Sequence, residues 1–133
     1  MLRGQCYCGA VQFQVEDDFR YAFYCHCSRC RRRTGAACAA IAGIDLEKLT
    51  ITAGTEFVAQ ASVSDRGYRC ICRKCCSPIY DALRNSAAGT VAHVQLGALS
   101  DTPSRVPDHH IHVASKAPWH AIRDGLPQYD ELP

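Results

Sequence analysis

The chain has 133 residues, 47% of them hydrophobic, which suits one domain (residues 1–133) with a modest core. Its 15 basic and 13 acidic residues give a formal charge of +2, so charge does not predict a nucleic-acid partner. No apolar run approaches the ~18 residues of a membrane-spanning helix, and the first residues lack an apolar leader. We therefore expect a cytoplasmic protein without a membrane partner.

Short segments that alternate apolar with polar residues predict a mainly β fold with antiparallel strands. Nine strands are expected, at 11–16, 21–26, 36–43, 49–52, 57–62, 68–72, 79–83, 91–99 and 110–114. Short helical turns are expected at 28–34 and at 119–124, where Pro127 prevents further extension. Strands this short bury little apolar area, so we expect zinc cross-links to supply much of the stability.

A closed zinc site is predicted from two cysteine pairs that lie far apart in the sequence. Cys72 and Cys75 form a Cys-x-x-Cys step, in which both thiolates reach one ion at about 2.3 Å. Cys6 and Cys8 supply the second pair most economically, and Gly9 after them permits a tight turn. A structural zinc ion on these four cysteines would clip the N-terminal segment to the middle of the chain and close a long loop.

A second zinc site is predicted from Cys25, Cys27 and Cys30, which place three thiolates within six residues. Three protein ligands with an open position are typical of catalytic zinc, so these three cysteines are the predicted catalytic residues. His26 lies between two of them and points to the opposite face if the segment is extended. The remaining candidates for a fourth ligand are Cys38, Cys70 and Cys76. A second closed structural site or a redox dithiol is the alternative.

Arginines surround Cys30 and form the densest basic patch of the chain. Three thiolates on one Zn²⁺ leave a net charge of about −1, which nearby guanidinium groups would offset. Arginine also suits bidentate binding of a carboxylate. We therefore predict that Arg29, Arg31 and Arg32 bind the carboxylates of an anionic thiol such as glutathione. The alternatives are a solvated charged turn and a nucleic-acid contact.

Motifs along almost the whole chain occur in the order typical of one family. They are GQCYCGAVQFQV at 4–15, CHCSRCRRRTGA at 25–36, CRKCCSPIY at 72–80, LGALSD at 96–101 and HIHVASKAPWHAIRDGLPQYD at 110–130. The chain thus resembles the glutathione-dependent formaldehyde-activating enzymes, also called the GFA or centromere protein V domain. The resemblance implies a β-tent fold and the same two zinc sites. One departure is Cys76, where the family usually has Gly.

The activity that this resemblance implies joins glutathione and formaldehyde reversibly as S-(hydroxymethyl)glutathione and is classed as a carbon–sulfur lyase. We therefore predict a zinc-dependent enzyme that acts on a small thiol adduct. The alternatives are a zinc-stabilised binding module and a glutathione carrier without turnover. Outside the predicted site, His109, His110 and His112 are expected on an exposed strand, and Trp119 is expected to pack on the core.

Overall fold

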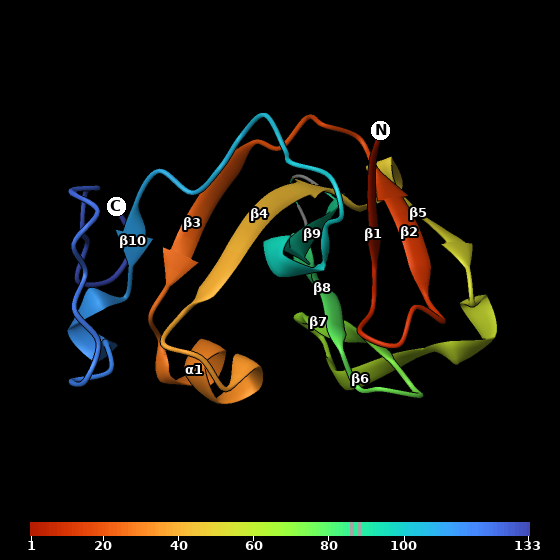
Figure 1. Cartoon of the computed structure of the whole chain (residues 1–133), viewed down its shortest axis with the longest axis horizontal. Coiled ribbons are helices and arrows are strands. Elements are labelled where there is room, and N and C mark those ends of the chain that lie inside the picture. Colours follow the sequence, from red (N-terminus) through yellow and green to blue (C-terminus); the bar gives the residue numbers. More distant parts are fainter. Residues whose placement is uncertain (86, 88) are drawn as a thin grey trace.

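The computed structural model describes residues 1–85, 87 and 89–133. These residues form a mainly β structure with one α-helix and several short 3₁₀ turns (Figure 1). The elements are β1 Leu2–Gln5, β2 Gln12–Val15, β3 Tyr21–Cys25, α1 Ser28–Thr34, β4 Ala39–Asp45, β5 Leu49–Ala53, β6 Val58–Ser64, β7 Gly67–Cys72, β8 Pro78–Asn85, β9 Gly89–Gln95 and β10 His110–Ile111. The predicted fold class is confirmed.

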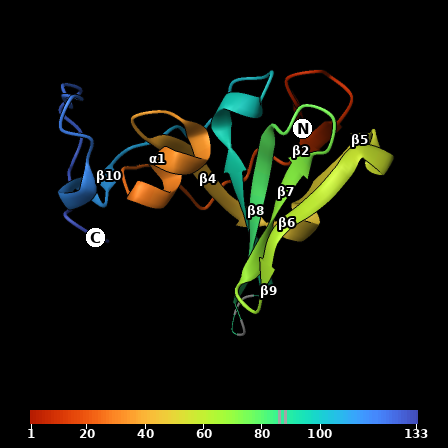
Figure 2. The same cartoon turned by 90° about the horizontal axis from the view of Figure 1, so that it is seen from below.

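The strands form two sheets. The smaller sheet has the order β1-β2-β5, and the larger has the order β10-β3-β4-β9-β8-β7-β6. Every pair of neighbouring strands is antiparallel except β10 with β3, which is parallel. Figure 1 shows β3 and β4 arching over α1, with β10 and the C-terminus beyond β3. In Figure 1, α1 lies below the arch with β6–β8 to its right, and the turned view in Figure 2 shows it between β10 and β8.

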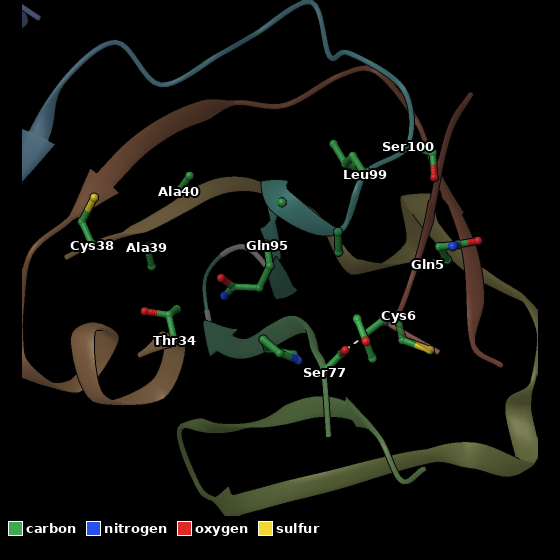
Figure 3. A pocket seen from close by; sticks show the side chains of 14 residues that line it. Gln5, Cys6, Thr34, Cys38, Ala39, Ala40, Ser77, Gln95, Leu99 and Ser100 are labelled. Carbon is green, nitrogen blue, oxygen red and sulfur yellow. Dashed lines mark hydrogen bonds between the residues drawn. The ribbon is translucent and has the colours of Figure 1, made fainter. Parts of the chain in front are cut away.

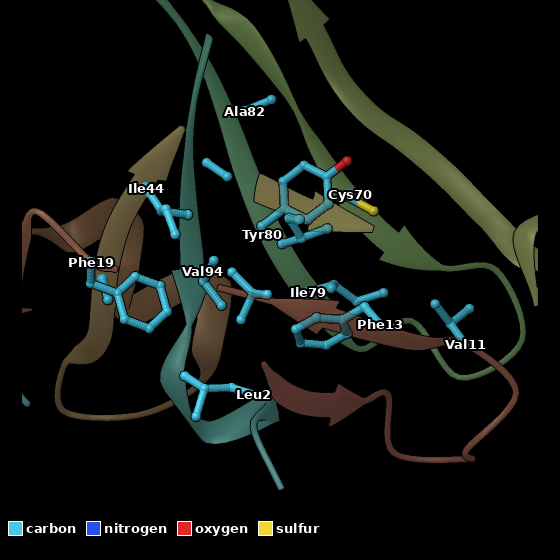
Figure 4. Packing of buried hydrophobic residues seen from close by; sticks show 14 of the residues in the cluster. Leu2, Val11, Phe13, Phe19, Ile44, Cys70, Ile79, Tyr80, Ala82 and Val94 are labelled. Atoms are coloured by element: carbon cyan, nitrogen blue, oxygen red, sulfur yellow. The ribbon is translucent and has the colours of Figure 1, made fainter. Parts of the chain in front are cut away.

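The main core lies where the small sheet packs against the large one. Figure 4 shows Phe13 of β2 beside Ile79 of β8, with Val94 of β9 and Leu2 of β1 nearby. These side chains are at most 7% exposed. A second buried cluster under the arch contains Phe23, Ile41 and Ile111 together with Cys25 and Cys30. Two predicted zinc ligands are thus packed among apolar side chains.

The helix α1 has both ends defined by local sequence. Cys27 is its N-cap, with its Sγ accepting a hydrogen bond from the Cys30 N–H at 3.3 Å. Gly35 ends the helix in the left-handed conformation, with φ at 66°. The predicted helical turn at 28–34 is confirmed. None of the described helices has the length and apolar character that a membrane crossing requires.

The structure differs from the sequence predictions in several places. Residues 119–124 form no helix. Trp119 is 72% exposed, so the expectation that it packs on the core is wrong, and a helix this short is not stable without such packing. The strand predicted at 110–114 is only His110–Ile111, because His112 adopts a left-handed φ of 55°. The strand β1 was not predicted, since four residues carry little periodicity.

Candidate functional site

The first cysteine cluster is formed by Cys6 and Cys8 after β1 and by Cys72 and Cys75 at the end of β7. All four Sγ atoms lie within 4.8 Å of one another. The Sγ of Cys8 is 3.6 Å from that of Cys6 and 3.9 Å from that of Cys72. A tetrahedral ion with Zn–S bonds of 2.3 Å separates its sulfurs by about 3.8 Å, so the cluster fits a zinc ion.

Polar groups around this four-cysteine cluster favour thiolates. The backbone N–H of Val11 donates to Cys6 Sγ at 3.3 Å, and the Ser77 hydroxyl lies 3.2 Å from Cys75 Sγ. Burial opposes ionisation of Cys75, but hydrogen bonds from Ser77 and from the Cys8 backbone outweigh it and lower its pKa to about 5. A zinc ligand must be deprotonated, so these contacts suit metal binding.

The second cluster brings Cys25, at the end of β3, against Cys27 and Cys30, at the start of α1. Their Sγ atoms lie within 4.8 Å of one another, and no other ligand atom of the described residues joins the group. The hydrogen bond from Cys30 lowers the pKa of Cys25, while the same contact raises that of Cys30. Ionised sulfurs this close repel one another, and a cation between them would relieve that repulsion. The three-cysteine cluster therefore fits a zinc ion with a free coordination position.

The other candidate fourth ligands lie elsewhere. Cys70 is buried in the main core, where burial raises its pKa to about 11. Cys76 is exposed, and Cys38 lines a different pocket. His26 is fully buried, with its Nε2 2.8 Å from Nδ1 of His110. His110 is also buried, so the expectation that it lies on an exposed strand is wrong.

A pocket of about 410 Å³ opens beside the three-cysteine cluster, and we call it the arginine pocket. Cys25 and Cys30 line it, together with four arginines: Arg29 and Arg33 of α1, and Arg66 and Arg69 of the β6–β7 hairpin. The hairpin can lie this close to β8 because residue 67 is glycine. A Cβ at that position would be only 1.7 Å from the Ala82 carbonyl oxygen. The pocket thus combines sulfur ligands with cationic groups.

Two of these arginines share one carboxylate inside the pocket, that of Asp81, which offsets part of their positive charge. Arg33 forms an ion pair with Asp81, and Arg69 Nε lies 3.5 Å from its other oxygen. Burial raises the pKa of Asp81, and the two guanidinium groups oppose that shift. No carboxylate of the described residues pairs with Arg29 or Arg66. These two side chains are available to bind an anionic group.

The three predicted arginines lie on different faces of α1. Arg29 lines the arginine pocket, whereas Arg31 and Arg32 do not, and their contact with a substrate stays a prediction. Residues four apart share one face of a helix, so Arg29 and Arg33 face the pocket together. Helical spacing could have found Arg33. Arg66 and Arg69 depend on the folding of a distant hairpin and had no such signal.

A larger pocket of about 580 Å³ is lined by residues from the end of α1 and from β4, β8 and β9 (Figure 3). Figure 3 shows Cys38 and Thr34 at one end of it, Cys6 and Gln5 at the other, and Gln95 between them. No charged residue of the described chain lines it. It contains none of the three clustered sulfurs, so the arginine pocket is the candidate substrate site.

Comparisons with known proteins identify the family of this chain. The family model described as "Glutathione-dependent formaldehyde-activating enzyme" matches residues 1–115. A Halomonas elongata protein named "Putative glutathione-dependent formaldehyde-activating enzyme" is 28% identical over 126 residues, which cover 90% of this chain and 79% of that protein. A crystal structure of a Rhodobacter sphaeroides protein aligns with a TM-score of 0.59 and 28% identity, over 79% of this chain and 97% of that one.

Proposed function

Because the chain belongs to the family of glutathione-dependent formaldehyde-activating enzymes, we propose that it is a carbon–sulfur lyase of the S-(hydroxymethyl)glutathione synthase type. Its substrates would be a small thiol such as glutathione and an aldehyde such as formaldehyde. One observation carries this proposal: two of the three clustered sulfurs line the same pocket as four arginines. A thiol substrate with carboxylates would match both groups at once.

The proposal assigns one structural zinc ion to the four-cysteine cluster and a second to Cys25, Cys27 and Cys30. When bound, the second ion supplies a coordination position at which a fourth thiolate exchanges. Arg29 and Arg66 bind the substrate carboxylates and thereby orient the thiol. Asp81 holds Arg33 and Arg69 in place and reduces the positive charge of the wall. The site thus favours one anionic ligand in one orientation.

The reaction itself is an addition. The thiol sulfur forms a bond to the carbonyl carbon, the carbonyl π pair moves to the oxygen, and the thiol proton ends on the new hydroxyl group. The reverse reaction breaks the same carbon–sulfur bond. Holding the thiol in one orientation converts a two-body encounter into a positioned attack, which is the contribution that this chain's own residues make.

The first experiment measures exchange between free formaldehyde and S-(hydroxymethyl)glutathione by NMR, with and without zinc-loaded protein. We expect the protein to accelerate the exchange, and the Cys27→Ser variant to lose that acceleration. Serine retains the N-cap hydrogen bond of α1, so this substitution removes a ligand without removing the helix cap. A fully active Cys27→Ser protein would overturn the assignment. Tight glutathione binding without acceleration would instead identify a carrier.

The second experiment separates substrate binding from the general effect of lost charge. Arg66→Ala removes a charge-assisted hydrogen bond of about 1.5–3 kcal/mol, so the KM for glutathione should rise by about tenfold or more. The matched control is Arg105→Ala, because Arg105 is exposed and lies outside the arginine pocket. Equal KM values for the two variants would contradict the proposed carboxylate contact.

A further inference from the structure

Three side chains form a hydrogen-bonded chain from the C-terminal tail to the loop that carries the three clustered cysteines. Oδ2 of Asp124 lies 2.8 Å from Nε2 of His110, and Nδ1 of His110 lies 2.8 Å from Nε2 of His26. The side chain of Asp124 is 41% exposed, that of His110 is 5% exposed, and His26 is fully buried. The hydrogen-bonded side chains thus connect the solvent to His26, the residue between Cys25 and Cys27.

The geometry defines the direction of the hydrogen bonds. An ionised carboxylate only accepts, so Nε2 of His110 donates to Asp124. With both imidazoles neutral, Nδ1 of His110 then accepts a hydrogen bond from Nε2 of His26. Nδ1 of His26 is buried and has no hydrogen-bond partner among the described residues. The orientation of the His26 ring is therefore determined from one side, through His110 and Asp124.

The backbone around this chain adds a second connection between the same segments. The His26 N–H donates to the Ile111 carbonyl at 3.0 Å, which continues the parallel pairing of β10 with β3. On its other side, His110 donates its N–H to Pro127 at 2.9 Å and accepts from the Tyr129 N–H at 3.0 Å. The tail therefore holds β10, and β10 holds the end of β3 from which Cys25 projects.

We propose that Asp124 and His110 are positioning residues for the three-cysteine site, acting through His26 on the backbone that carries Cys25 and Cys27. The inference rests on the zinc site of the proposed function but not on its lyase activity. Groups that orient metal ligands from outside the coordination sphere typically alter metal affinity or activity by about 10–100-fold when they are removed. The tail thereby controls how firmly the site retains its metal.

The test follows the release of zinc from the full, zinc-loaded chain to a chromogenic chelator. Two release phases are expected, and the phase that Cys27→Ser lacks belongs to the three-cysteine site. His110→Phe retains a ring that stacks on Tyr24, where the centroids are 4.9 Å apart, but deletes both hydrogen bonds. Asp124→Ala removes the solvent end of the chain at a partly exposed position. We expect each variant to accelerate the assigned phase about tenfold while the other phase stays unchanged.

The matched control is Asp108→Ala. Asp108 is hydrogen bonded to the neighbouring His109 at 2.5 Å, but this pair does not reach His26. If the zinc-release phase of the three-cysteine site keeps its rate in both His110→Phe and Asp124→Ala, the inference is overturned. So would acceleration of both phases with a lower thermal midpoint, since that indicates general loosening of the fold. If His110→Phe fails to fold, Asp124→Ala decides the outcome. Altered zinc release in a chain without lyase activity would refute the proposed function alone.

Discussion

The two cysteine clusters of this molecule use the same ligand type in opposite ways. The four-cysteine cluster joins segments 64 residues apart, as the contact between Cys8 and Cys72 shows. The three-cysteine cluster lies within six consecutive residues and connects β3 only to the adjacent α1. Closing a long loop removes more entropy from the unfolded chain than closing a short one. This difference supports the proposed division of roles, in which the four-cysteine cluster would stabilise the fold and the three-cysteine cluster would bind the substrate thiol.

The largest expected effect comes from Cys72→Ser. Cys72 is fully buried, and the loss of a structural zinc ion removes about 10 kcal/mol of apparent folding free energy in small zinc domains. That amount is comparable to the total stability of a typical domain, roughly 5–15 kcal/mol. We therefore expect no cooperative urea transition by circular dichroism. Zinc content should fall from two ions per chain to one or none.

The paired variant Cys27→Ser sharpens the contrast. It should also lose one zinc ion per chain, yet its free energy of unfolding should fall by less than that of Cys72→Ser, because the three-cysteine cluster closes only a short loop and serine remains a good N-cap for α1. Urea titration and metal analysis of both proteins give the answer. Equal losses of stability in Cys72→Ser and Cys27→Ser would show that both clusters are structural.

An intermediate loss of folding stability is expected at acid pH from His93, which lines the arginine pocket. Burial, aided by the charge of Arg33, lowers the pKa of His93 to about 4, from an ordinary value of 6.5. Between these values the unfolded state binds the extra proton. The stability is therefore fully present above pH 6.5 and is lost as the pH falls toward 4, by at most about 3 kcal/mol.

The variant His93→Gln isolates this contribution. Glutamine can still pair with the Tyr21 hydroxyl, which lies 2.9 Å from His93 Nε2, but it does not titrate. Unfolding free energies at a series of pH values from 4 to 7 should decline less steeply for the variant than for the natural chain. Taking the difference between the two proteins cancels protonation of the cysteines. Parallel curves would contradict the role of His93.

The smallest expected effect concerns Cys76, beside the four-cysteine cluster but outside it. Its φ of 63° is left-handed, which costs a side-chain-bearing residue about 1–2 kcal/mol, whereas glycine adopts it freely. Glycine also loses more entropy on folding, so Cys76→Gly should gain only about 0.5–1 kcal/mol. Thermal melts that follow zinc retention test this. A loss of stability or of zinc would show that Cys76 contributes to the cluster.

Much of the site could be predicted from local spacing. The cysteines form three local groups, which begin at Cys6, Cys25 and Cys72. Within each group so few residues separate the cysteines that their sulfurs must lie close together. The helical turn at 28–34 followed from the same local pattern. The helix predicted in the C-terminal tail was wrong because it depended on long-range packing. The pattern at 119–124 suited a helix, but a helix of that length needs tertiary packing, and Trp119 is exposed.

The sequence by itself therefore determined the β class, the family and the local cysteine groups, because these depend on composition, ordered motifs and short-range spacing. The pairing of Cys6 and Cys8 with Cys72 and Cys75, across 64 residues, followed from the four ligands that zinc requires and from the family motifs. Only the tertiary structure decided which charges surround the three-cysteine cluster. Arg66, Arg69 and Asp81 reach it through strand pairing in the large sheet, and Asp124 reaches it through β10. Such contacts depend on register and crossover between distant segments, which no local pattern specifies.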